Sequence, residues 1–341
     1  MPPLFTIGMP VYNAMPYLPE AVASVLGQTY PHCELLAIND GSRDGSLEYL
    51  RSIRDPRIRI ICQNNRGITF TLNQLLVEAR APWLVRLDAD DVAHPERLAL
   101  VAEATERRPG AGMFYSRADH YGHASMVAAA RSSEGTPAEL REITRAGYLL
   151  SIVHSSVVID VEKTRALGGY RFDLQVEDLD LWWRMALQHE IVFIPKVTVR
   201  YRLNHESVCM ANLKELAANT LFAQYLLLSH LWRLEAQPYE AVIGALGAML
   251  DKGRLGYREQ MWRAAAHLSA QRVSSAVPHL VRAALLSPTQ FMRRAAYPLS
   301  NEIVRRGEDP RRFRRIARQL WSPEIADNFT IDRQAIRDVG R

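Results

Sequence analysis

Three aspartates lie within four positions in the run Leu87-Asp88-Ala89-Asp90-Asp91. The apolar residues at 83–87 indicate a mostly buried strand, which leads directly into these acids. Neighbouring carboxylates repel one another, so such a run at the end of a strand favours a bound cation or a set of hydrogen-bond donors. A solvated acidic turn that caps the next helix is the alternative. The run by itself fits both interpretations equally.

Two other predicted strands end in residues that could bind a nucleotide. Pro10-Val11-Tyr12-Asn13 follows the first, and Asp40-Gly41-Ser42 follows the second. An aromatic ring can lie flat on a nucleobase, and a carboxylate can accept a hydrogen bond from the imide N–H of uracil or thymine. A partly buried turn aromatic and a cap on the Gly-Ser turn are the structural alternatives.

These residues are positioned by an alternation of strands and helices. We predict strands at 4–9 (stopped by Pro10), 34–39, 58–62 and 83–87, with intervening helices that start near Pro19 and span 47–53 and about 68–79. Nearly all-apolar strands joined by short connections predict a doubly wound, parallel α/β sheet with right-handed crossovers. In such sheets ligands bind beyond the carboxyl ends of the strands, so the loops after the first, second and fourth strands should face one crevice.

The rest of the chain divides less clearly. We predict a helix at 95–108, strands at 113–115 and 155–159, a helix that ends at 168–169, a helix that opens at 177–178, and two short strands at 191–194 and 197–201. Residues 117–150 receive no assignment. After about residue 210 only helical spacing is seen. The expected domains are therefore 1–210, with halves 1–110 and 111–210, and a helical region 211–341.

Composition is that of an ordinary globular protein. The chain has 341 residues, 48% of them hydrophobic, and its three cysteines are too few for a disulfide framework or a zinc site, which suggests a reducing cytoplasm. No secretion signal is visible, and the longest apolar run, at 241–250, is too short to cross a bilayer. The formal net charge of +5 suits an anionic partner without identifying it.

Five motifs in order carry a resemblance to a known family. They are Met9-Pro10-Val11-Tyr12-Asn13, Ile38-Asn39-Asp40-Gly41-Ser42-Arg43-Asp44-Gly45-Ser46, Leu87-Asp88-Ala89-Asp90-Asp91, Gly168-Gly169-Tyr170 and Glu177-Asp178-Leu179-Asp180-Leu181-Trp182. The set resembles family 2 of the glycosyltransferases, inverting enzymes with the GT-A fold, over roughly residues 4–208. The resemblance implies a nucleotide-diphospho-sugar transferase fold, here with an all-α C-terminal extension.

The resemblance also implies the reaction and the donor site. A metal-dependent enzyme would move a sugar from a nucleoside diphosphate sugar, with UDP-sugars favoured, to a saccharide or lipid-linked saccharide, in cell-surface polysaccharide or glycolipid biosynthesis. Pro10, Tyr12 and Asp40 would bind the nucleotide, and Asp88 would meet the ribose and order metal-bound water. Asp90 would hold Mn²⁺ or Mg²⁺, which stabilises the charge on the departing diphosphate.

Two further residues have a donor-side role and an ordinary alternative. Arg66 could add a cation near the diphosphate, or it is a solvated turn arginine. His205 lies where GT-A enzymes often place a late histidine on the metal or diphosphate, and a nitrogen ligand would favour Mn²⁺ over Mg²⁺. A surface histidine is the alternative. His154 is a weaker candidate for the acceptor side.

The acceptor side centres on the Glu-Asp pair. The family resemblance makes Asp178 the base that takes the proton of the acceptor hydroxyl, and the start of a helix should favour its ionised form. Glu177 would orient the acceptor. Trp182 is a candidate sugar platform, although its helical phase with Met185 fits a core position as well. A pair of simple helix-capping acids is the alternative.

The C-terminal region is basic in clusters, with Arg305-Arg306 and Arg311-Arg312-Phe313-Arg314-Arg315. Solvated helix faces are the usual explanation, and docking on the inner face of an anionic membrane is a further hypothesis. Nucleic-acid binding is not expected, because residues 301–341 have ten Arg against seven Asp and Glu. A nucleotidyltransferase would need a glycine-rich loop after the first strand, which Pro10-Val11-Tyr12-Asn13 does not provide. A non-catalytic protein of the same fold is the remaining alternative.

Overall fold

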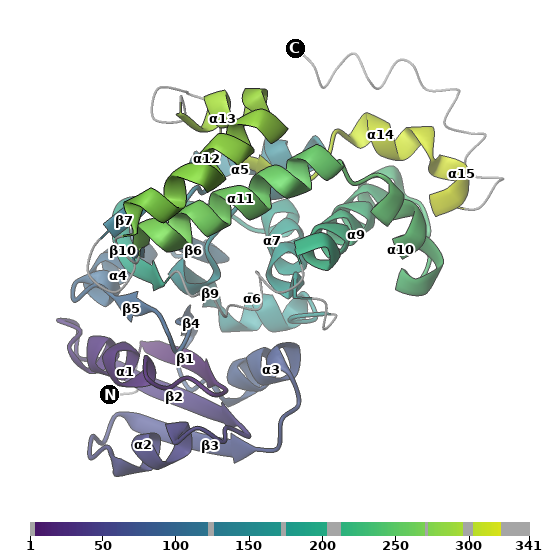
Figure 1. Cartoon of the computed structure of the whole chain (residues 1–341). Coiled ribbons are helices and arrows are strands. Elements are labelled where there is room, and N and C mark those ends of the chain that lie inside the picture. Colours follow the sequence, from purple (N-terminus) through teal and green to yellow (C-terminus); the bar gives the residue numbers. More distant parts are fainter. Residues whose placement is uncertain are drawn as a thin grey trace.

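A twisted nine-stranded sheet forms the centre of the molecule (Figure 1). The computed structural model describes residues 4–121, 126–171, 175–202, 213–269, 272–295 and 303–321. The strands of this sheet are β1 (Phe5–Val11), β2 (Cys33–Asp40), β3 (Ile58–Gln63), β4 (Trp83–Arg86), β5 (Val92–Ala93), β6 (Met113–Tyr121), β7 (Met126–Ala129), β9 (Val157–Asp160) and β10 (Ile191–Arg202). Their spatial order is β3-β2-β1-β4-β9-β6-β10-β5, and β7 pairs with β6. Pairing is parallel except at β5, β7 and β9, so the predicted mostly parallel α/β fold is confirmed.

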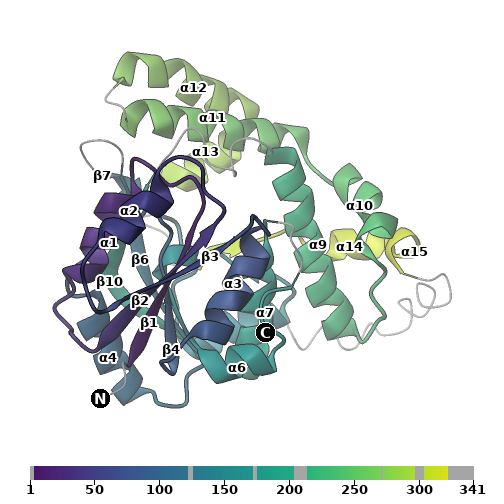
Figure 2. The same cartoon turned by 90° about the horizontal axis from the view of Figure 1, so that it is seen from below.

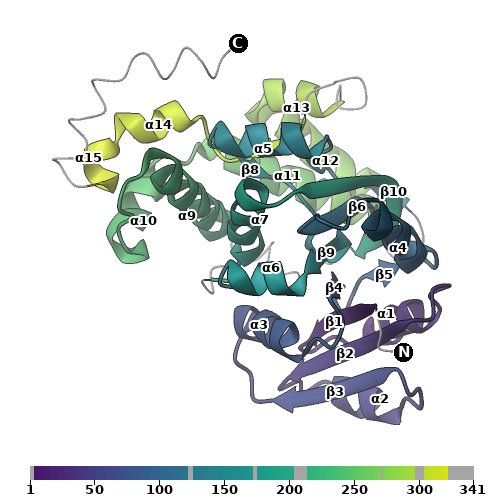
Figure 3. The same ribbon diagram turned by 180° about the vertical axis from the view of Figure 1, so that it is seen from behind.

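Helices cover both faces of the sheet. They are α1 (Leu18–Leu26), α2 (Ser46–Ser52), α3 (Ile68–Glu78), α4 (Arg97–Arg107), α5 (Pro137–Arg145), α6 (Val161–Ala166) and α7 (Glu177–Gln188), with a 3-10 turn η1 at His154–Ser156. One core cluster takes side chains from α1, α2 and α4, and the other takes them from α3, α5 and α7. Figure 3 shows α1 on one side of β1 and α3 on the other. Along β2, Leu36 and Ile38 enter the second cluster while Leu35 and Ala37 enter the first. This double burial explains the nearly unbroken apolar sequence of the strand.

The first strand does not stop at Pro10, contrary to the sequence prediction. β1 runs to Val11, and Pro10 pairs with Ile38 of β2. On the other side, the last β4 pair is Gly8 with Arg86, and the Gly8 carbonyl accepts the N–H of Leu87 at 3.3 Å. Since alternate residues of a strand bond to opposite neighbours, the missing N–H of Pro10 points to this side, beyond the end of the β4 ladder. The proline therefore costs no ladder hydrogen bond.

Two other strand predictions also change. The short strands predicted at 191–194 and 197–201 are one continuous strand, β10, whose pairing with β6 shifts register around Val197. Within the unassigned residues 117–150 lie the end of β6, β7, α5 and the short strand β8 (Leu149–Leu150). Helix α5 begins with a capping box in which Thr136 and Glu139 bond reciprocally. Apolar and polar residues do not alternate regularly enough in residues 117–150 to indicate these elements from the sequence.

The C-terminal region is helical and packs against the α/β part of the chain. Its helices are α9 (Leu213–Trp232), α10 (Tyr239–Ala248), α11 (Lys252–Ser269), α12 (Val273–Leu286), α13 (Pro288–Ala295), α14 (Pro310–Arg315) and α15 (Ala317–Leu320). Ala223 and Leu227 of α9 pack in the same core cluster as α7. A short strand, β11 (Arg305–Arg306), pairs antiparallel with β8, which the sequence did not predict. None of the described helices is long and apolar enough to cross a membrane.

Candidate active site

The loops after β1 and β2 are bonded to each other at the carboxyl ends of the strands. The Asn13 N–H donates to Ser42 Oγ at 3.0 Å, and the Arg43 N–H donates to Asn13 Oδ1 at 2.8 Å. The Met15 N–H donates to Asp44 Oδ2 at 2.8 Å. Tyr12, at the end of β1, is 53% exposed, which leaves its ring face available to a planar ligand. The expectation that these two loops share one rim is confirmed.

Asp40 connects this rim to the loop after β3. Its side chain is buried, with Oδ1 accepting from Gln63 Nε2 at 2.7 Å and from the Arg66 N–H at 2.8 Å. Oδ2 accepts from the Gly67 N–H at 3.1 Å. A carboxylate has about four lone-pair positions, so it can accept one more donor. The Arg66 guanidinium lies 3.4 Å above the ring of Phe70 in the following helix, α3, so its side chain packs on that helix.

Asp88 is held by two partners at the end of β4. Its carboxylate accepts from buried Arg86 Nη2 and from Ser155 Oγ at 2.8 Å, and its own N–H donates to Ser155 Oγ at 3.1 Å. Burial opposes ionisation of Asp88, but the charge of Arg86 and the hydrogen bonds from Ser155 and Arg86 outweigh it and lower the pKa of Asp88. Asp88 is therefore the fixed anion of the acidic run. Arg86 and Ser155 lie outside the recognised motifs and were missed by the sequence.

The other two acids of the run differ in role. Burial and the charge of Asp88 raise the pKa of Asp90 to about 6. Asp91 is fully buried, its Oδ1 accepts from the Arg202 N–H at 2.8 Å, and burial raises its pKa well above the ordinary value. Arg202 also donates through Nε to the Asp90 carbonyl at 2.8 Å. Asp91 and Arg202 thus fix the loop to β10, which leaves Asp88 and Asp90 as the pair that can face a ligand.

These two carboxylates fit a hard divalent cation. Asp90 is hard to ionise because it is buried and lies near Asp88, and a cation bound by both carboxylates would offset their repulsion. Oxygen ligands of this kind suit Mg²⁺ and Mn²⁺. The described residues hold no group of three or more His, Cys, Asp or Glu able to bind a metal, so phosphate and water oxygens would supply the remaining ligands. His205, predicted as a ligand, lies outside the described residues.

The Glu-Asp pair opens α7, as predicted. Burial and the charge of Asp178 raise the pKa of Glu177 to about 8. Burial also raises the pKa of Asp178, the Arg306 charge and the Leu179 N–H oppose the rise, and the charge of Asp88 adds to it. The prediction that the helix start would favour ionised Asp178 is therefore wrong in its net direction, because burial outweighs the N-terminal N–H groups. The influence of Asp88 on Asp178 also indicates that the two acidic motifs lie close to each other.

Arg306 reaches this site from the C-terminal region. Its Nε donates to Ser151 Oγ at 3.1 Å, next to β8, and its charge acts on Asp178. The Ser133 hydroxyl bonds to the Val304 carbonyl, which holds the adjoining segment. No local sequence signal connects Arg306 with Asp178. The β8–β11 pairing and the bonds to Ser133 and Ser151 bring them together.

The Gly-Gly-Tyr motif shapes the wall between α3 and α7. Gly169 has φ of +63°, and a Cβ there would lie 2.4 Å from Asn73 Oδ1, so only glycine fits. Asn73 in turn bonds both backbone groups of Tyr170, at 2.8 and 2.9 Å. The Tyr170 hydroxyl lies 3.1 Å from His154 Nε2, and burial followed by the Arg86 charge lowers the pKa of His154 to about 3. His154 is thus a neutral wall residue.

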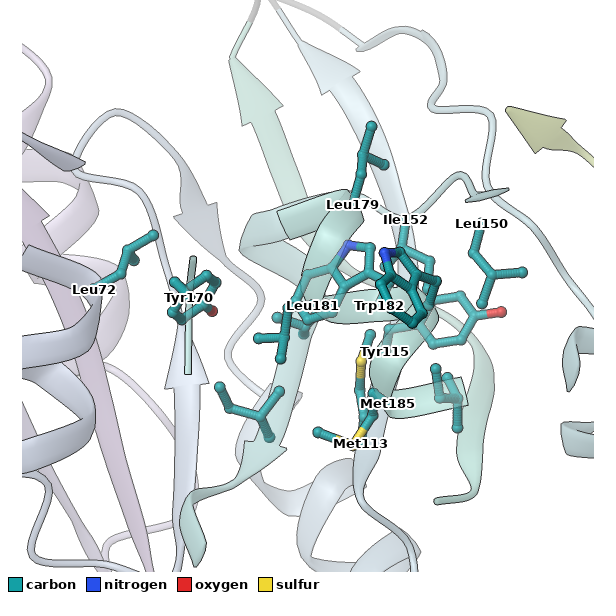
Figure 4. Packing of buried hydrophobic residues seen from close by; sticks show 14 of the residues in the cluster. Leu72, Met113, Tyr115, Leu150, Ile152, Tyr170, Leu179, Leu181, Trp182 and Met185 are labelled. Carbon is teal, nitrogen blue, oxygen red and sulfur yellow. The ribbon is translucent and has the colours of Figure 1, made fainter. Parts of the chain in front are cut away.

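Trp182 does not lie at the acceptor side. Its side chain is completely buried in the core cluster with Tyr115 and Met185, and Figure 4 shows it among these residues. A fully enclosed ring offers no platform to a sugar, so the core interpretation is the correct one. Asp180 is also structural, because it pairs with Arg171 and Arg184, both at 2.7 Å.

A groove of about 960 Å³ lies elsewhere, between α9, α10 and α11. Its lining includes Glu215, Tyr239 and Arg263 and contains none of the predicted site residues. The candidate active site is therefore defined by the converging loops at the strand ends and not by this groove.

Comparison with known proteins identifies the family of the chain. Residues 6–148 match the model described as Glycosyl transferase family 2. The chain belongs to glycosyltransferase family 2. An uncharacterized glycosyltransferase of Haemophilus influenzae is 36% identical over 108 residues, which cover 31% of this chain and 33% of that protein. The chain spans about a third of the length of the curated relatives that match it first.

Solved structures show the fold of this family 2 member. Residues 1–349 of S. aureus TarS, in complex with UDP-GlcNAc, align with a TM-score of 0.53 at 13% identity over 84% of this chain and 91% of that one. The mannosyltransferase PcManGT from Pyrobaculum calidifontis, in complex with GDP-Man and Mn²⁺, aligns with a TM-score of 0.51 at 18% identity over 88% of this chain and 82% of that one. The fold is the GT-A type, with a helical C-terminal region.

Proposed function

We propose that this family 2 glycosyltransferase is an inverting, metal-dependent enzyme that moves a sugar from a nucleoside diphosphate sugar to a saccharide or lipid-linked saccharide hydroxyl. The observation that carries the proposal is electrostatic. The charge of Asp88 contributes to the raised pKa of both Asp90 and Asp178, so the acidic run and the Glu-Asp pair act in one site. UDP-sugars are the favoured donors.

The donor side is formed by three loops. Tyr12, at the end of β1 with Pro10, would stack on the base, and Asp40 would accept its imide N–H. Asp88, held by Arg86 and Ser155, would face the ribose, and Asp90 would hold the cation. A bound Mn²⁺ or Mg²⁺ would stabilise negative charge on the leaving diphosphate. The nucleotide sugars bound by the two GT-A neighbours, and the Mn²⁺ in the PcManGT complex, support these choices.

The acceptor side depends on Asp178. Its Oδ1 accepts the Leu179 N–H at 2.7 Å, and Oδ2 makes no hydrogen bond to the described residues. A raised pKa makes the ionised carboxylate of Asp178 a stronger base. Its Oδ2 would take the proton of the acceptor hydroxyl while the hydroxyl oxygen attacks the anomeric carbon of the donor sugar. Glu177, with its pKa at about 8, would stay protonated at neutral pH and donate a hydrogen bond to the acceptor. A cell-surface polysaccharide or glycolipid is the proposed product class.

The test is release of the nucleoside diphosphate from UDP-, GDP- and dTDP-sugars, with and without Mn²⁺. Wild type should turn over at least one donor only with metal, and Asp90→Ala and Asp178→Asn should each lose turnover. Equal rates in all three proteins would contradict the site assignment. Donor binding without turnover in wild type would instead favour the alternative, a non-catalytic nucleotide-sugar-binding protein.

A further inference from the structure

The outer face of α12 carries an apolar stripe. Val273 is 61% exposed, Val277 50%, Val281 53% and Leu285 76%, at intervals of four residues. Each four-residue step turns about 40° around a helix, so the four side chains cover roughly 120° of one face. An apolar face of this width is normally packed against a partner. Figure 2 shows α12 at the outer edge of the molecule, with α11 between it and the sheet.

The opposite face of α12 is fixed against α11. Ala276 and Ala283 are fully buried there, and His279 Nδ1 lies 2.7 Å from Gln260 Oε1 of α11. The stripe therefore points outward because the small residues and the polar contact occupy the inner face. Turning the helix to bury the valines would break these contacts.

Exposed apolar side chains are concentrated in this segment. Of the nine large ones among the described residues, six lie between 273 and 292: the four of the stripe together with Leu286 and Met292. Tyr12 and Met15 belong to the donor loop, and Val77 is alone on α3. Soluble proteins rarely expose a contiguous apolar patch without a binding role.

The same segment is strongly cationic. Residues 272–295, which span α12 and α13, contain four Arg and no Asp or Glu, although the whole chain has a net charge of only +5. Arg272 and Arg282 are exposed at the start and on the outer side of α12. Apolar side chains and arginines on one exposed helical segment are typical of helices that lie in the headgroup region of an anionic bilayer.

The basic clusters predicted for membrane contact lie elsewhere and are engaged within the fold. Arg305 stacks on Tyr148 at 4.4 Å, and Arg311 pairs with Asp309 at 2.6 Å. Arg312 pairs with Glu308 at 2.6 Å, and Arg314 lies 5.0 Å from the Trp232 ring. These arginines stabilise the C-terminal region, so α12 and α13 are the better candidates for the contact.

We propose that α12 and α13 dock on an anionic lipid surface, with the apolar stripe at the boundary between headgroups and acyl chains. A second copy of the chain is the main competing occupant, but a twofold contact through α12 would bring like arginines together. The position of the packed helices α11 and α12 is consistent with a lipid-linked acceptor. Trp262 of α11 lies 6.4 Å from His120 near the end of β6, at the edge of the sheet where β4 also ends. Acceptor delivery rests on the proposed function, whereas lipid binding does not.

The test is flotation of the full chain with vesicles, without donor or metal. One set of vesicles is phosphatidylcholine, and the other is equal parts phosphatidylcholine and phosphatidylglycerol. Wild type should float with the mixed vesicles and should be released by high salt. The double variant Val277→Ser with Val281→Ser should lower the partition coefficient by about tenfold or more. Arg282→Gln should lower it about fivefold on the mixed vesicles.

Val77→Ser is the matched control, because Val77 is 71% exposed on α3, away from the stripe. It should float like wild type, and all variants should keep the wild-type circular dichroism. No flotation of wild type, or equal flotation of the double variant, would overturn the proposal. The proposal would also be overturned if light scattering without lipid showed a dimer for wild type and a monomer for the double variant. Because lipid-free turnover is measured separately, failure of lipid binding and failure of the transferase assignment can be told apart.

Discussion

Two aspartates of α7 should respond in opposite ways to the same substitution. Asp178 is partly exposed and lies in the site, whereas Asp180 is 1% exposed and pairs with Arg184 and Arg171. Asn has the shape of Asp and keeps an oxygen for the Leu179 N–H that Asp178 accepts at 2.7 Å. Asp178→Asn therefore removes the proton acceptor with little change in structure.

The expected size of each effect follows from these surroundings. General base catalysis contributes about 10²–10⁴-fold, so Asp178→Asn should lower kcat by that factor, or about 3–5 kcal/mol in the barrier. Stability should stay the same or rise slightly, because burial already disfavours the charge of Asp178. Asp180→Asn leaves Arg184, whose side chain is 6% exposed, without its buried partner. That change should cost about 3–5 kcal/mol and lower Tm by roughly 6–20 °C.

The assay is release of the nucleoside diphosphate at saturating donor and acceptor, with thermal unfolding measured on the same samples. Asp178→Asn should lose turnover at unchanged Tm, and Asp180→Asn should lose stability first. If Asp178→Asn retained more than about a tenth of the wild-type kcat, Asp178 would not be the base. If both variants lost activity and stability in parallel, the helix would have only a structural role.

Three further predictions concern residues around this pair. Arg306→Ala should raise the pKa of Asp178, because the arginine charge opposes the effect of burial. The acid limb of the pH profile of kcat/KM should then move to higher pH. Arg306→Lys keeps the positive charge and should return the acid limb most of the way to its wild-type position. Trp182→Phe should lower the free energy of unfolding by about 1–3 kcal/mol, seen as a lower Tm, and leave the acceptor KM unchanged, because the Trp182 ring is fully enclosed. A selective rise in the acceptor KM would return Trp182 to the acceptor site. Gly169→Ala should lower the free energy of unfolding by about 1–3 kcal/mol, because the new Cβ would lie 2.4 Å from Asn73 Oδ1 and the residue has φ of +63°. Urea unfolding measures this change. An unchanged urea midpoint would contradict the close contact.

The sequence predicted the nucleotide-binding half well because its strands are buried on both faces. Nearly continuous apolar runs ending in polar loops identify β1, β2 and β4 and put their loops on one rim. The error at Pro10 arose because a proline ends a strand only where its missing N–H would have been used. Whether that N–H faces a neighbouring strand depends on the lengths of the adjacent strands, which no local pattern reveals.

The acidic residues of the site could be predicted from the sequence, whereas the residues that interact with them could not. Asp40, Asp90 and Asp178 follow from strand ends and a helix start, but the ionisation of Asp90 and Asp178 depends on burial and on charges brought from elsewhere in the chain. Arg306 acts through the β8–β11 pairing, and two-residue strands leave no periodicity to detect. The helical phase that Trp182 shares with Met185 correctly indicated a core position. It was more informative than the aromatic residue type, which suggested a sugar platform.

Calorimetric binding of UDP, GDP and dTDP to wild type, Asp90→Ala and Asp178→Asn, with and without Mn²⁺, tests the central claim most directly. The claim is that Asp88 and Asp90 form the metal–nucleotide side of the site while Asp178 serves the acceptor. Wild type and Asp178→Asn should bind at least one nucleotide tightly only with Mn²⁺, and Asp90→Ala should lose this metal dependence. Metal-independent binding that Asp90→Ala leaves unchanged, or no binding of any of the three nucleotides to wild type, would contradict the claim.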